Sequence, residues 1–373
     1  MHRGFKRTTA IFAVLLTLLL CACSAPVSSN HSVFVPAHAE SGELAVHFID
    51  VGQGDSEFIE LPNGETMLID GGESEYGETV SGYISSLGYS EITYLVATHP
   101  HSDHIGGLPD VLDHFEVLNI YMPDAESSSS VYSEFLNKAD SEGCPVIQAS
   151  ESVSVIESEN LSARFLAPCS SGYDDLNNYS AVLKLTFEDT SFLFMGDAEE
   201  VSEEEIHADP SADVVKVGHH GSDTSSSQNF IGRVSPQYAV IEVGEGNSYG
   251  HPNEQIVERW QNAGAEILRT DQLGSIVIVS DGGDLTVNSE NDSDQLRQNS
   301  GSAQSASQLQ ETVSNTQSGS EYTYVLNTSS KKIHTPDCSA VSSMSQSNKE
   351  YTQRSLQELE SEGYAPCSIC DPE

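Results

Sequence analysis

Basic residues are scarce in this chain of 373 residues, which has 15 Lys and Arg against 57 Asp and Glu and a formal net charge of −42. Only seven of the basic residues lie between residues 43 and 290. Proteins that grip long nucleic acid usually gather Lys and Arg on the binding surface. The field of this chain should instead repel a polyanion over a Debye length of about 8 Å. The composition therefore disfavours nucleic acid as a partner, although solubility or a high-salt habitat explains the charge equally well.

The chain also lacks a hydrophobic run of comfortable transmembrane length. The apolar stretch at residues 10–20 is shorter than the roughly 20 residues that a membrane helix needs. It follows a basic start at Arg3, Lys6 and Arg7, with no acidic residue before it. This order of segments is the pattern of a secretion signal, so we expect the segment to direct export.

The signal ends at residues 20–23 in the letters LCAC, which resemble a bacterial lipobox. Small Ala22 precedes Cys23, whereas Leu20 precedes Cys21, so Cys23 is the preferred lipid-attachment residue. Ordinary cleavage after Ala39 is the alternative. A lipid anchor would hold the protein at the extracellular face of the bacterial cell membrane. The predicted boundaries are a lipoprotein signal peptide at 1–23 and a tether at 24–42, the latter with little to bury.

Cysteine is rare as well, with seven in the chain. Cys144 and Cys169 could pair outside the cytoplasm, which the sequence leaves open. Three others fall in the last fifty or so residues with one histidine, spaced H-x3-C-x28-C-x2-C: His334, Cys338, Cys367 and Cys370. Four such ligands suit a closed tetrahedral zinc site. The segment resembles the zinc-binding amino-terminal domain of Ada DNA-repair proteins, with a histidine in place of the first cysteine. A disulfide among the cysteines is the alternative.

The most informative stretch that is present reads His-Pro-His-Ser-Asp-His at residues 99–104. Imidazole and carboxylate are the ligands that hold zinc, manganese or iron. Alternate residues of an extended backbone point the same way, so His99 and His101 can share one ion while Asp103 and His104 turn toward a second. The apolar residues 92–98 before them predict a buried strand. The ligands then follow the carboxyl end of a strand, where α/β sheets place their sites.

Residues 43–290 are long enough for one sizeable α/β domain, in which early hairpins give way to alternating strands and helices. Residues 291–320 are rich in Ser, Gln and Asn and predict a flexible linker, and residues 321–373 predict a small domain that needs a staple. Strands are expected at 44–50, 55–61, 65–70, 161–167, 181–187, 192–196, 214–218, 239–243 and 275–279, and helices at 105–115, 201–206 and 253–263.

Several more polar stretches follow apolar strands in the main domain: DVGQGDS at 50–56, LIDGG at 68–72, NNYS at 177–180, GDA at 196–198, KVGHHGS at 216–222 and YGHP at 249–252. Together with the histidine cluster they resemble the metallo-β-lactamase superfamily, and within it the soluble hydrolase domain of the ComEC/Rec2 competence proteins. The resemblance covers residues 44 to about 280. It implies a four-layer αββα sandwich with a two-metal site.

The resemblance also implies roles for single residues. It assigns His99 and His101 to the first metal, Asp103 and His104 to the second, and Asp197 as a bridge between them. A histidine of the pair His219 and His220 completes the second site, with His219 the ligand we name and His220 a catalytic acid. The ions themselves would be Zn or Mn. The chain departs from the superfamily where a further histidine is often found, since it has NNYS there, and it lacks the transmembrane channel of the ComEC proteins.

A metal pair of this kind activates a water for attack on an ester. Asp103 can orient that water and take its proton, and His220 or His251 can protonate the leaving group. Asn178, Ser180 and His251 are candidate substrate contacts, although loop capping is an open alternative for the first two. Two further carboxylates, Asp50 and Asp70, could accept hydrogen bonds from ligand imidazoles or from strand ends instead.

The sequence therefore predicts a surface-anchored, dinuclear metal-dependent hydrolase of phosphoesters with a structural zinc in its tail. The sharper form of this prediction is a nuclease for DNA processing, which the charge disfavours. One alternative is a phosphodiesterase of the cell wall or of small molecules, as in the phosphorylcholine esterases of the same superfamily. The other is a metal-binding lipoprotein adaptor without catalysis.

Overall fold

The computed structural model describes residues 36–291 and, in the C-terminal part, segments 324–328, 331–335, 349–352 and 364–367 with Cys338, Val341, Arg354, Leu356, Leu359 and Cys370. The chain divides into two compact units between residues 299 and 300. The predicted signal peptide, Cys23 and the predicted linker lie outside the described residues. No helix among the described residues has the length and apolar character needed to cross a membrane.

The first sheet of the main unit has eight strands in the order β17-β16-β1-β2-β3-β5-β7-β8. Neighbours are antiparallel from β17 to β3 and parallel from β3 to β8. The strands are β1 (Leu44–Phe48), β2 (Glu57–Glu60), β3 (Thr66–Ile69), β5 (Tyr94–Val96), β7 (Ile120–Met122), β8 (Val146–Gln148), β16 (Ile276–Ser280) and β17 (Leu285–Ser289).

The second sheet has seven strands in the order β15-β14-β13-β12-β11-β10-β9. It is antiparallel from β9 to β12 and parallel from β12 to β15. Its strands are β9 (Ser154–Glu157), β10 (Leu161–Phe165), β11 (Leu183–Phe187), β12 (Thr190–Phe194), β13 (Val214–Lys216), β14 (Tyr238–Ile241) and β15 (Glu266–Arg269). A short pair, β4 (Glu91–Ile92) and β6 (Glu116–Val117), lies apart from both sheets.

The alternation of side chains along the strands builds three apolar layers, because successive residues of a strand point to opposite faces. Phe192 and Phe194 of β12 join the core between the two sheets, whereas Leu193 joins the core under the outer helices. Met67 and Leu68 of β3 divide in the same way. Both sheets are therefore buried on both faces.

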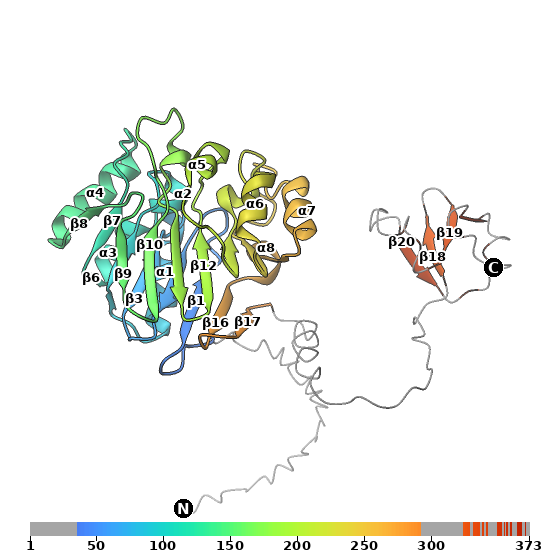
Figure 1. Cartoon of the computed structure of the whole chain (residues 1–373), viewed down its shortest axis with the longest axis horizontal. Helices are drawn as coiled ribbons and strands as arrows, with labels where there is room; N and C mark the ends of the chain where they lie inside the picture. Colours follow the sequence, from blue (N-terminus) through green and yellow to red (C-terminus); the bar gives the residue numbers. More distant parts are fainter. Residues whose placement is uncertain are drawn as a thin grey trace, which may run out of the picture. The chain divides into compact units, whose positions relative to one another are not determined.

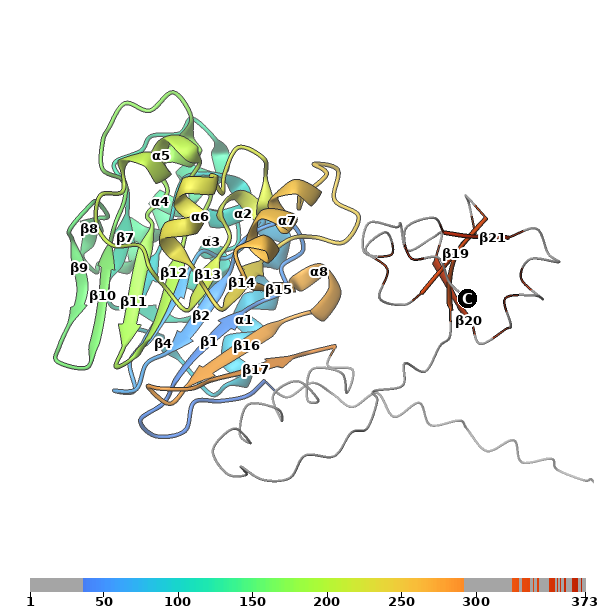
Figure 2. The same cartoon turned by 45° about the vertical axis from the view of Figure 1, so that its right-hand side comes forward.

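Helices cover the outer face of each sheet (Figures 1 and 2). The first sheet packs against α1 (Gly77–Ser86), α3 (Leu108–His114) and α4 (Ser130–Glu142), and the second against α6 (Gln228–Val234) and α7 (Glu254–Asn262). The short helices are α2 (Ser102–Ile105), α5 (Glu200–Glu205), α8 (Thr270–Leu273), η1 (Ser74–Tyr76), η2 (Leu176–Tyr179) and η3 (Gly218–Gly221). This order of helix, sheet, sheet and helix confirms the predicted four-layer αββα sandwich.

The predicted helix at 105–115 is instead two pieces, α2 and α3. Gly106 and Gly107 separate them, and a Cβ on Gly107 would lie 2.1 Å from the carbonyl oxygen of Gly71. The backbones approach so closely here that only glycine fits. The first of the two helices, α2, begins at Ser102, before the predicted start at residue 105. Asp103 and His104 therefore lie in a helical turn and not in an extended segment.

The N-terminal end of the main unit is tied to the first sheet at Glu60. The Glu60 carboxylate accepts a hydrogen bond of 3.1 Å from the backbone N–H of Ala39, and its other oxygen lies 3.3 Å from Nδ1 of His38. Glu60 ends β2 and pairs with Thr66 at the start of β3. The chain therefore enters the sandwich at the end of the sheet opposite the loops that follow β3 and β5.

The C-terminal unit contains a four-stranded sheet in the order β20-β18-β19-β21. Its strands are β18 (Tyr324–Asn327), β19 (Lys332–His334), β20 (Lys349–Thr352) and β21 (Ala365–Pro366). Among the residues of this unit that the structure describes, the larger of two apolar clusters consists of Tyr324, Leu326, Ile333, Leu359 and Tyr364.

Candidate metal centre

The polar motifs of the main unit meet at one end of the two sheets. Asp70 directly follows β3, His99 follows β5 after two residues, Asp197 follows β12 and His219 follows β13. Within the first sheet β3 and β5 are parallel, and within the second sheet β12 and β13 are parallel. Their carboxyl ends therefore deliver the ligand-bearing loops to one place, as the sequence predicted.

Four residues of these motifs form one compact group: Asp103, His104, Asp197 and His220. Nε2 of His104 lies 3.2 Å from Oδ1 of Asp197, and Nε2 of His220 lies 3.5 Å from the same oxygen and 3.4 Å from Oδ2 of Asp103. Ligands at about 2.1 Å on a tetrahedral ion lie about 3.4 Å from one another. The structure thus places His220, rather than His219, with the residues predicted for the second metal.

Unpartnered buried atoms test whether a metal fits this group. Nε2 of His104, Nε2 of His220 and Oδ1 of Asp197 are all buried without a hydrogen-bond partner. Buried polar atoms are nearly always satisfied in folded proteins. These three face one another, so a divalent ion between them would satisfy all three at once. The donor set, two imidazoles and two carboxylates, suits Zn or Mn.

A second group consists of His99, His101 and Asp197. Nε2 of His99 lies 2.9 Å from Nδ1 of His101 and 3.9 Å from Oδ2 of Asp197. Asp197 therefore turns one carboxylate oxygen to each group, which is the arrangement expected of a bridging ligand. His219 lies at the edge of this side, with Nε2 3.7 Å from Oδ2 of Asp197.

Asp70 fixes the two histidines that flank it. It is fully buried, and it accepts hydrogen bonds from Nδ1 of His104 at 2.8 Å and from the hydroxyl and backbone N–H of Thr98. The Thr98 hydroxyl in turn lies 3.1 Å from Nδ1 of His99. With Nδ1 engaged on each ring, Nε2 is left for a metal. Asp50 does not share this role, because its carboxylate accepts the backbone N–H of Gly52 in its own turn.

Asp55 and Lys216 form a buried ion pair under the second group, and the sequence did not predict this role for either. Both side chains are at most 1 % exposed, and the Lys216 ammonium contacts the Asp55 carboxylate and, at 3.1 Å, the carbonyl oxygen of Gly196. Asp55 Oδ1 lies 3.1 Å from Nδ1 of His220. A lysine within the apolar strand β13 is the sequence signal that could have revealed the pair, since buried lysine requires a partner.

Two more carboxyl groups, Glu57 and Glu242, are buried beside this pair. Burial and the charges of Glu242 and Asp55 raise the pKa of Glu57 well above 4.5. Burial and the charge of Asp55 raise the pKa of Glu242 to about 8. Both shifts favour the protonated form of these groups, which limits the number of charges below the site.

The protonation of the ligands responds strongly to this setting. Burial alone would lower the pKa of His220, but the carboxylates of Asp197 and Asp55 outweigh it and raise the pKa to about 10. The same two carboxylates raise the pKa of His104 well above 6.5 against its burial. Burial, together with the charge of His104, lowers the pKa of His99 well below 6.5. Without an ion, protons on His104 and His220 supply the positive charge that the buried carboxylates require.

The predicted substrate contacts differ in accessibility. Ser180 is fully buried, and its hydroxyl accepts the backbone N–H of Asp197 at 3.0 Å, so it positions the bridging residue instead of meeting substrate. Asn178 donates to Glu199 at 3.0 Å and accepts the N–H of Ser202 at 3.2 Å, which is the loop-capping alternative. His251 does reach the cleft above the metal ligands.

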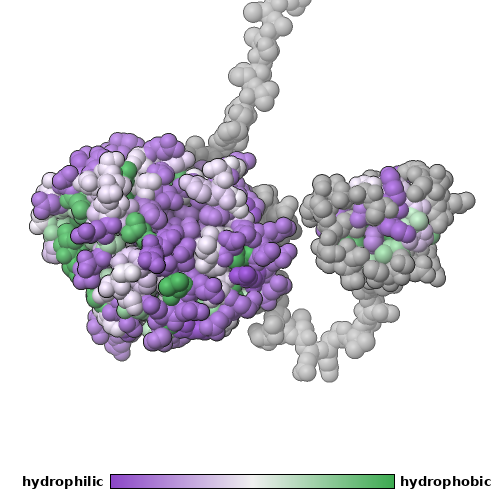
Figure 3. All heavy atoms as spheres, turned by 90° about the horizontal axis from the view of Figure 1, so that it is seen from above, coloured by the Kyte–Doolittle hydropathy of each residue, from purple (hydrophilic) through white to green (hydrophobic). Residues whose placement is uncertain are grey.

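This cleft has a volume of about 290 Å³ and is lined by Gln53, His101, Ser102, Asp103, Asn177, Asp197, His219, His220, Tyr249 and His251. A neighbouring cleft of about 520 Å³ shares Gln53, Asp103 and Tyr249 with it and is otherwise lined by Asp50, Gly52, Glu73, Glu75, Tyr76, Gly244, Glu245 and Asn247. Neither lining contains Lys or Arg. Figure 3 shows the face of the main unit seen from above the view in Figure 1, where hydrophilic residues predominate.

A model of the metallo-beta-lactamase superfamily matches residues 49–244, which is more than half of the chain and includes every ligand of the two groups. The chain belongs to this superfamily. The superfamily fold binds divalent metals and serves metal-dependent hydrolysis, in agreement with the geometry of the ligands.

Three relatives with curated names place the chain near competence proteins. ComE operon protein 3 of Bacillus subtilis (strain 168) is 31% identical over 63% of this chain and 33% of its own length. Competence protein ComA of Neisseria gonorrhoeae is 30% identical over 65% and 33%, and Recombination protein 2 of Haemophilus influenzae is 26% identical over 62% and 28%. The similarity confirms the resemblance of the motifs to ComEC/Rec2 proteins. The chain spans about a third of the length of these relatives.

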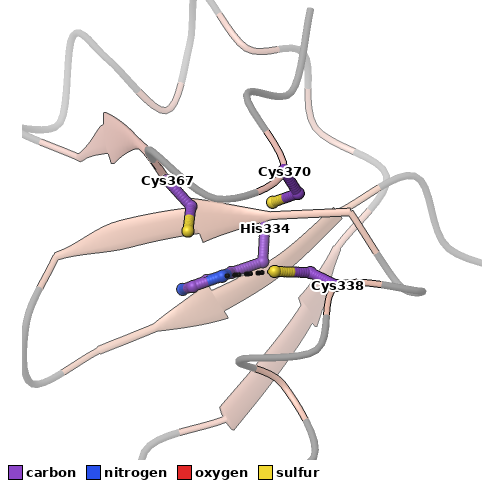
Figure 4. A group of neighbouring side chains, drawn as sticks. All are labelled: His334, Cys338, Cys367 and Cys370. Atoms are coloured by element: carbon purple, nitrogen blue, oxygen red, sulfur yellow. Dashed lines mark hydrogen bonds between the residues drawn. The ribbon is translucent and has the colours of Figure 1, made fainter.

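The C-terminal unit brings its four predicted ligands together. The ligand atoms of His334, Cys338, Cys367 and Cys370 all lie within 4.8 Å of one another, and Figure 4 shows the side chains pointing to a common centre. Nδ1 of His334 lies 3.4 Å from Sγ of Cys338, close to the roughly 3.6 Å between N and S ligands on tetrahedral zinc. The backbone N–H of Thr335 donates to Sγ of Cys370 at 3.5 Å. Cys144 and Cys169 of the main unit are not joined to each other.

Proposed function

We propose that the main unit is a dinuclear metal-dependent phosphodiesterase. The observation that carries the proposal is the Asp197 carboxylate, which turns Oδ1 to His104 and His220 and Oδ2 to His99 and His219. A carboxylate shared by two imidazole-rich groups suits the paired ions that hydrolyse phosphate esters.

The residues around the cleft supply the remaining steps. When bound, two divalent ions lower the pKa of a water and draw charge from the ester. Asp103 is about a quarter exposed to the cleft; burial would raise the pKa of its carboxyl, but the neighbouring imidazoles of His104 and His220 lower it below 3.8. Its carboxylate therefore stays ionised and can accept the hydrogen bond that orients the attacking water. His251 is then the residue left to protonate the leaving group, since His220 lies among the ligands.

The charge distribution favours small phosphodiesters over long duplex DNA. A duplex presents one phosphate per about 1.7 Å of its axis, and binding it requires several neutralising cations. The two clefts at the site contain no Lys or Arg, and the second carries Asp50, Glu73, Glu75 and Glu245. Ions at the site would attract one phosphate, but they would not offset the repulsion between the acidic residues of the second cleft and the other phosphates of a long duplex.

The test is kcat/KM for duplex DNA and for a chromogenic phosphodiester, each at two salt concentrations. We expect the small diester to be preferred at low salt, and added salt to improve any DNA cleavage by screening the repulsion. Asp103→Asn is the control, because it should abolish both activities if they share this site. Efficient duplex cleavage that weakens as salt rises would contradict the preference for small diesters.

We further propose that the protein is anchored through lipid on Cys23 at the extracellular face of the bacterial membrane. The support is the LCAC sequence after a basic and then apolar start. Cys23→Ser should remain unprocessed or leave the membrane fraction, and labelled fatty acid should not enter it. Incorporation of label into Cys23→Ser would refute the assignment, with Cys21→Ser as the matched control.

We also propose that the C-terminal unit holds one structural zinc. Its four ligands converge, and a domain of about fifty residues usually needs a metal or a disulfide to offset its chain entropy. In the full chain, Cys338→Ser should lower the zinc content by one ion per chain while phosphodiester turnover continues. A disulfide that survives in the native protein and an unchanged zinc content would contradict the proposal.

A further inference from the structure

The first metal group is one protein ligand short of the second. His99, His101 and Asp197 make three ligands, whereas Asp103, His104, Asp197 and His220 make four. Protein sites for zinc usually provide three ligands and a water or four ligands. The segment 177–180 near this group contains no histidine, and within it Ser180 and Asn178 are occupied by the contacts described above.

His219 lies on the side of Asp197 that faces the first group. Its Nε2 is 3.7 Å from Oδ2 of Asp197, the oxygen that lies 3.9 Å from Nε2 of His99. His220, the next residue, approaches the other oxygen, Oδ1, at 3.5 Å. The adjacent histidines therefore address opposite sides of one bridging carboxylate.

The other nitrogen of His219 is already held. Nδ1 lies 3.1 Å from the hydroxyl of Thr224 and 3.5 Å from a carboxylate oxygen of Glu199, which Asn178 steadies with a hydrogen bond of 3.0 Å. Metal-binding histidines almost always donate their second N–H to a carboxylate, carbonyl or water. The arrangement leaves Nε2 of His219 free of these partners and turned to the cleft.

A buried amide next to His219 lacks a partner for its oxygen. Nδ2 of Asn177 lies 3.5 Å from Nε2 of His219, and its Oδ1 is buried without any hydrogen bond. Asn177 is 6 % exposed and lines the same cleft. The unpartnered oxygen thus belongs to a side chain that lines the cleft next to His219, where a bound ligand could satisfy it.

The backbone at His219 and His220 has an uncommon conformation that directs the two rings to different sides of Asp197. His219 and His220 both have φ of 51°, in the left-handed region that non-glycine residues rarely adopt. Such residues are strained and persist mainly at functional sites. Two in succession make the tight turn of η3, from which the neighbouring rings reach the two groups separately.

We propose that Nε2 of His219 is the third imidazole ligand of the first metal, with His220 serving the second. The inference rests on the proposed dinuclear function and deepens it. It assigns each histidine of the pair to a different ion, so removing them should affect different ions. It also gives Glu199 and Thr224 the role of positioning residues that hold the His219 ring.

The test counts bound ions per full-length chain after dialysis against buffered zinc. Asn tolerates left-handed backbone, so His219→Asn and His220→Asn keep the turn while they remove the imidazole. Each variant should bind one ion fewer than the native protein, with the lost site weakened at least about 100-fold. The zinc of the C-terminal unit is common to all variants and cancels in the differences. His251→Asn is the control from the same cleft and should retain every ion.

Double variants decide to which site each histidine belongs. His99→Ala with His219→Asn should lose a single ion, because both residues serve the first metal. His219→Asn with His220→Asn should lose two. Full ion content in folded His219→Asn, or loss of two ions when it is combined with His99→Ala, would overturn the inference. A native protein that binds only one ion beyond the C-terminal zinc would instead refute the dinuclear function itself.

Discussion

Replacing Asp55 with Asn should destabilise the main unit, because it removes the carboxylate that pairs with the Lys216 ammonium. The two side chains are 1 % and 0 % exposed. Breaking a buried ion pair by removing one partner costs about 3–5 kcal/mol. We expect about 3 kcal/mol, at the lower end, because Glu242 acts on Lys216 and can release its proton to restore part of the charge balance.

The measurement is thermal unfolding of the full chain at pH 7 with a chelator, so that bound ions do not contribute to the difference. A domain of this size shifts by roughly 2–4 °C per kcal/mol, so Tm should fall by roughly 6–12 °C. Asp113→Asn is the matched control, since Asp113 pairs with Lys138 where the side chains are 56 % and 35 % exposed. An exposed pair contributes at most about 1 kcal/mol.

The double variant Asp55→Asn with Lys216→Met separates the pair from its surroundings. It removes both charges together, so it should regain at least half of the lost stability. Two results would refute the reasoning: a Tm loss in Asp55→Asn no larger than in Asp113→Asn, or a double variant that is less stable than the single one.

Three further predictions concern the charges of the site. Asp197→Ala should lose both ions of the main unit and its activity together, because the carboxylate is shared; two tightly held ions with full turnover would contradict the bridge. With the C-terminal site already filled, zinc binding to the main unit at pH 7 should release protons, since the raised pKa values of His104 and His220 favour their protonated forms in the free site and both must bind as neutral imidazoles; titration calorimetry in buffers of different ionisation enthalpy counts them, and release of none would contradict the raised pKa values. Glu242→Gln should unfold at a higher temperature than the native protein at pH 8 but not at pH 5. The folded pKa of Glu242 is about 8 and its ordinary value 4.5, so the native state loses stability as pH rises between them; an equal difference in Tm at both pH values would refute this.

The layered fold and most of the ligands could be predicted because they depend on short-range patterns. His99, His101, Asp103 and His104 lie within six residues, and Asp197 directly follows an apolar strand. Strand ends and their polar loops are local features, and the rule that such loops gather at one edge of a sheet is general.

The division between His219 and His220 could not be predicted, because it depends on backbone angles that the letters do not encode. At the end of a regular strand the two rings would point to opposite faces of the sheet. The left-handed turn instead places each ring next to a different oxygen of Asp197. Ser180 was misplaced for a related reason. A hydroxyl in a polar motif suits a substrate contact, but burial commits it to the backbone of Asp197.

The Asp55 and Lys216 pair joins residues 161 positions apart along the chain. Their pairing depends on how β13 of the second sheet faces the loop before β2 of the first, which is a tertiary relation. The lysine in an apolar strand indicated only that some partner must exist.

The tie of Ala39 to Glu60 fixes the end of the main unit at which the N-terminal segment joins it. Glu60 lies where β3 begins, and the ligand-bearing loops lie where β3 and β5 end. An anchor ahead of His38, as proposed for Cys23, would therefore join the sandwich at the end opposite the cleft.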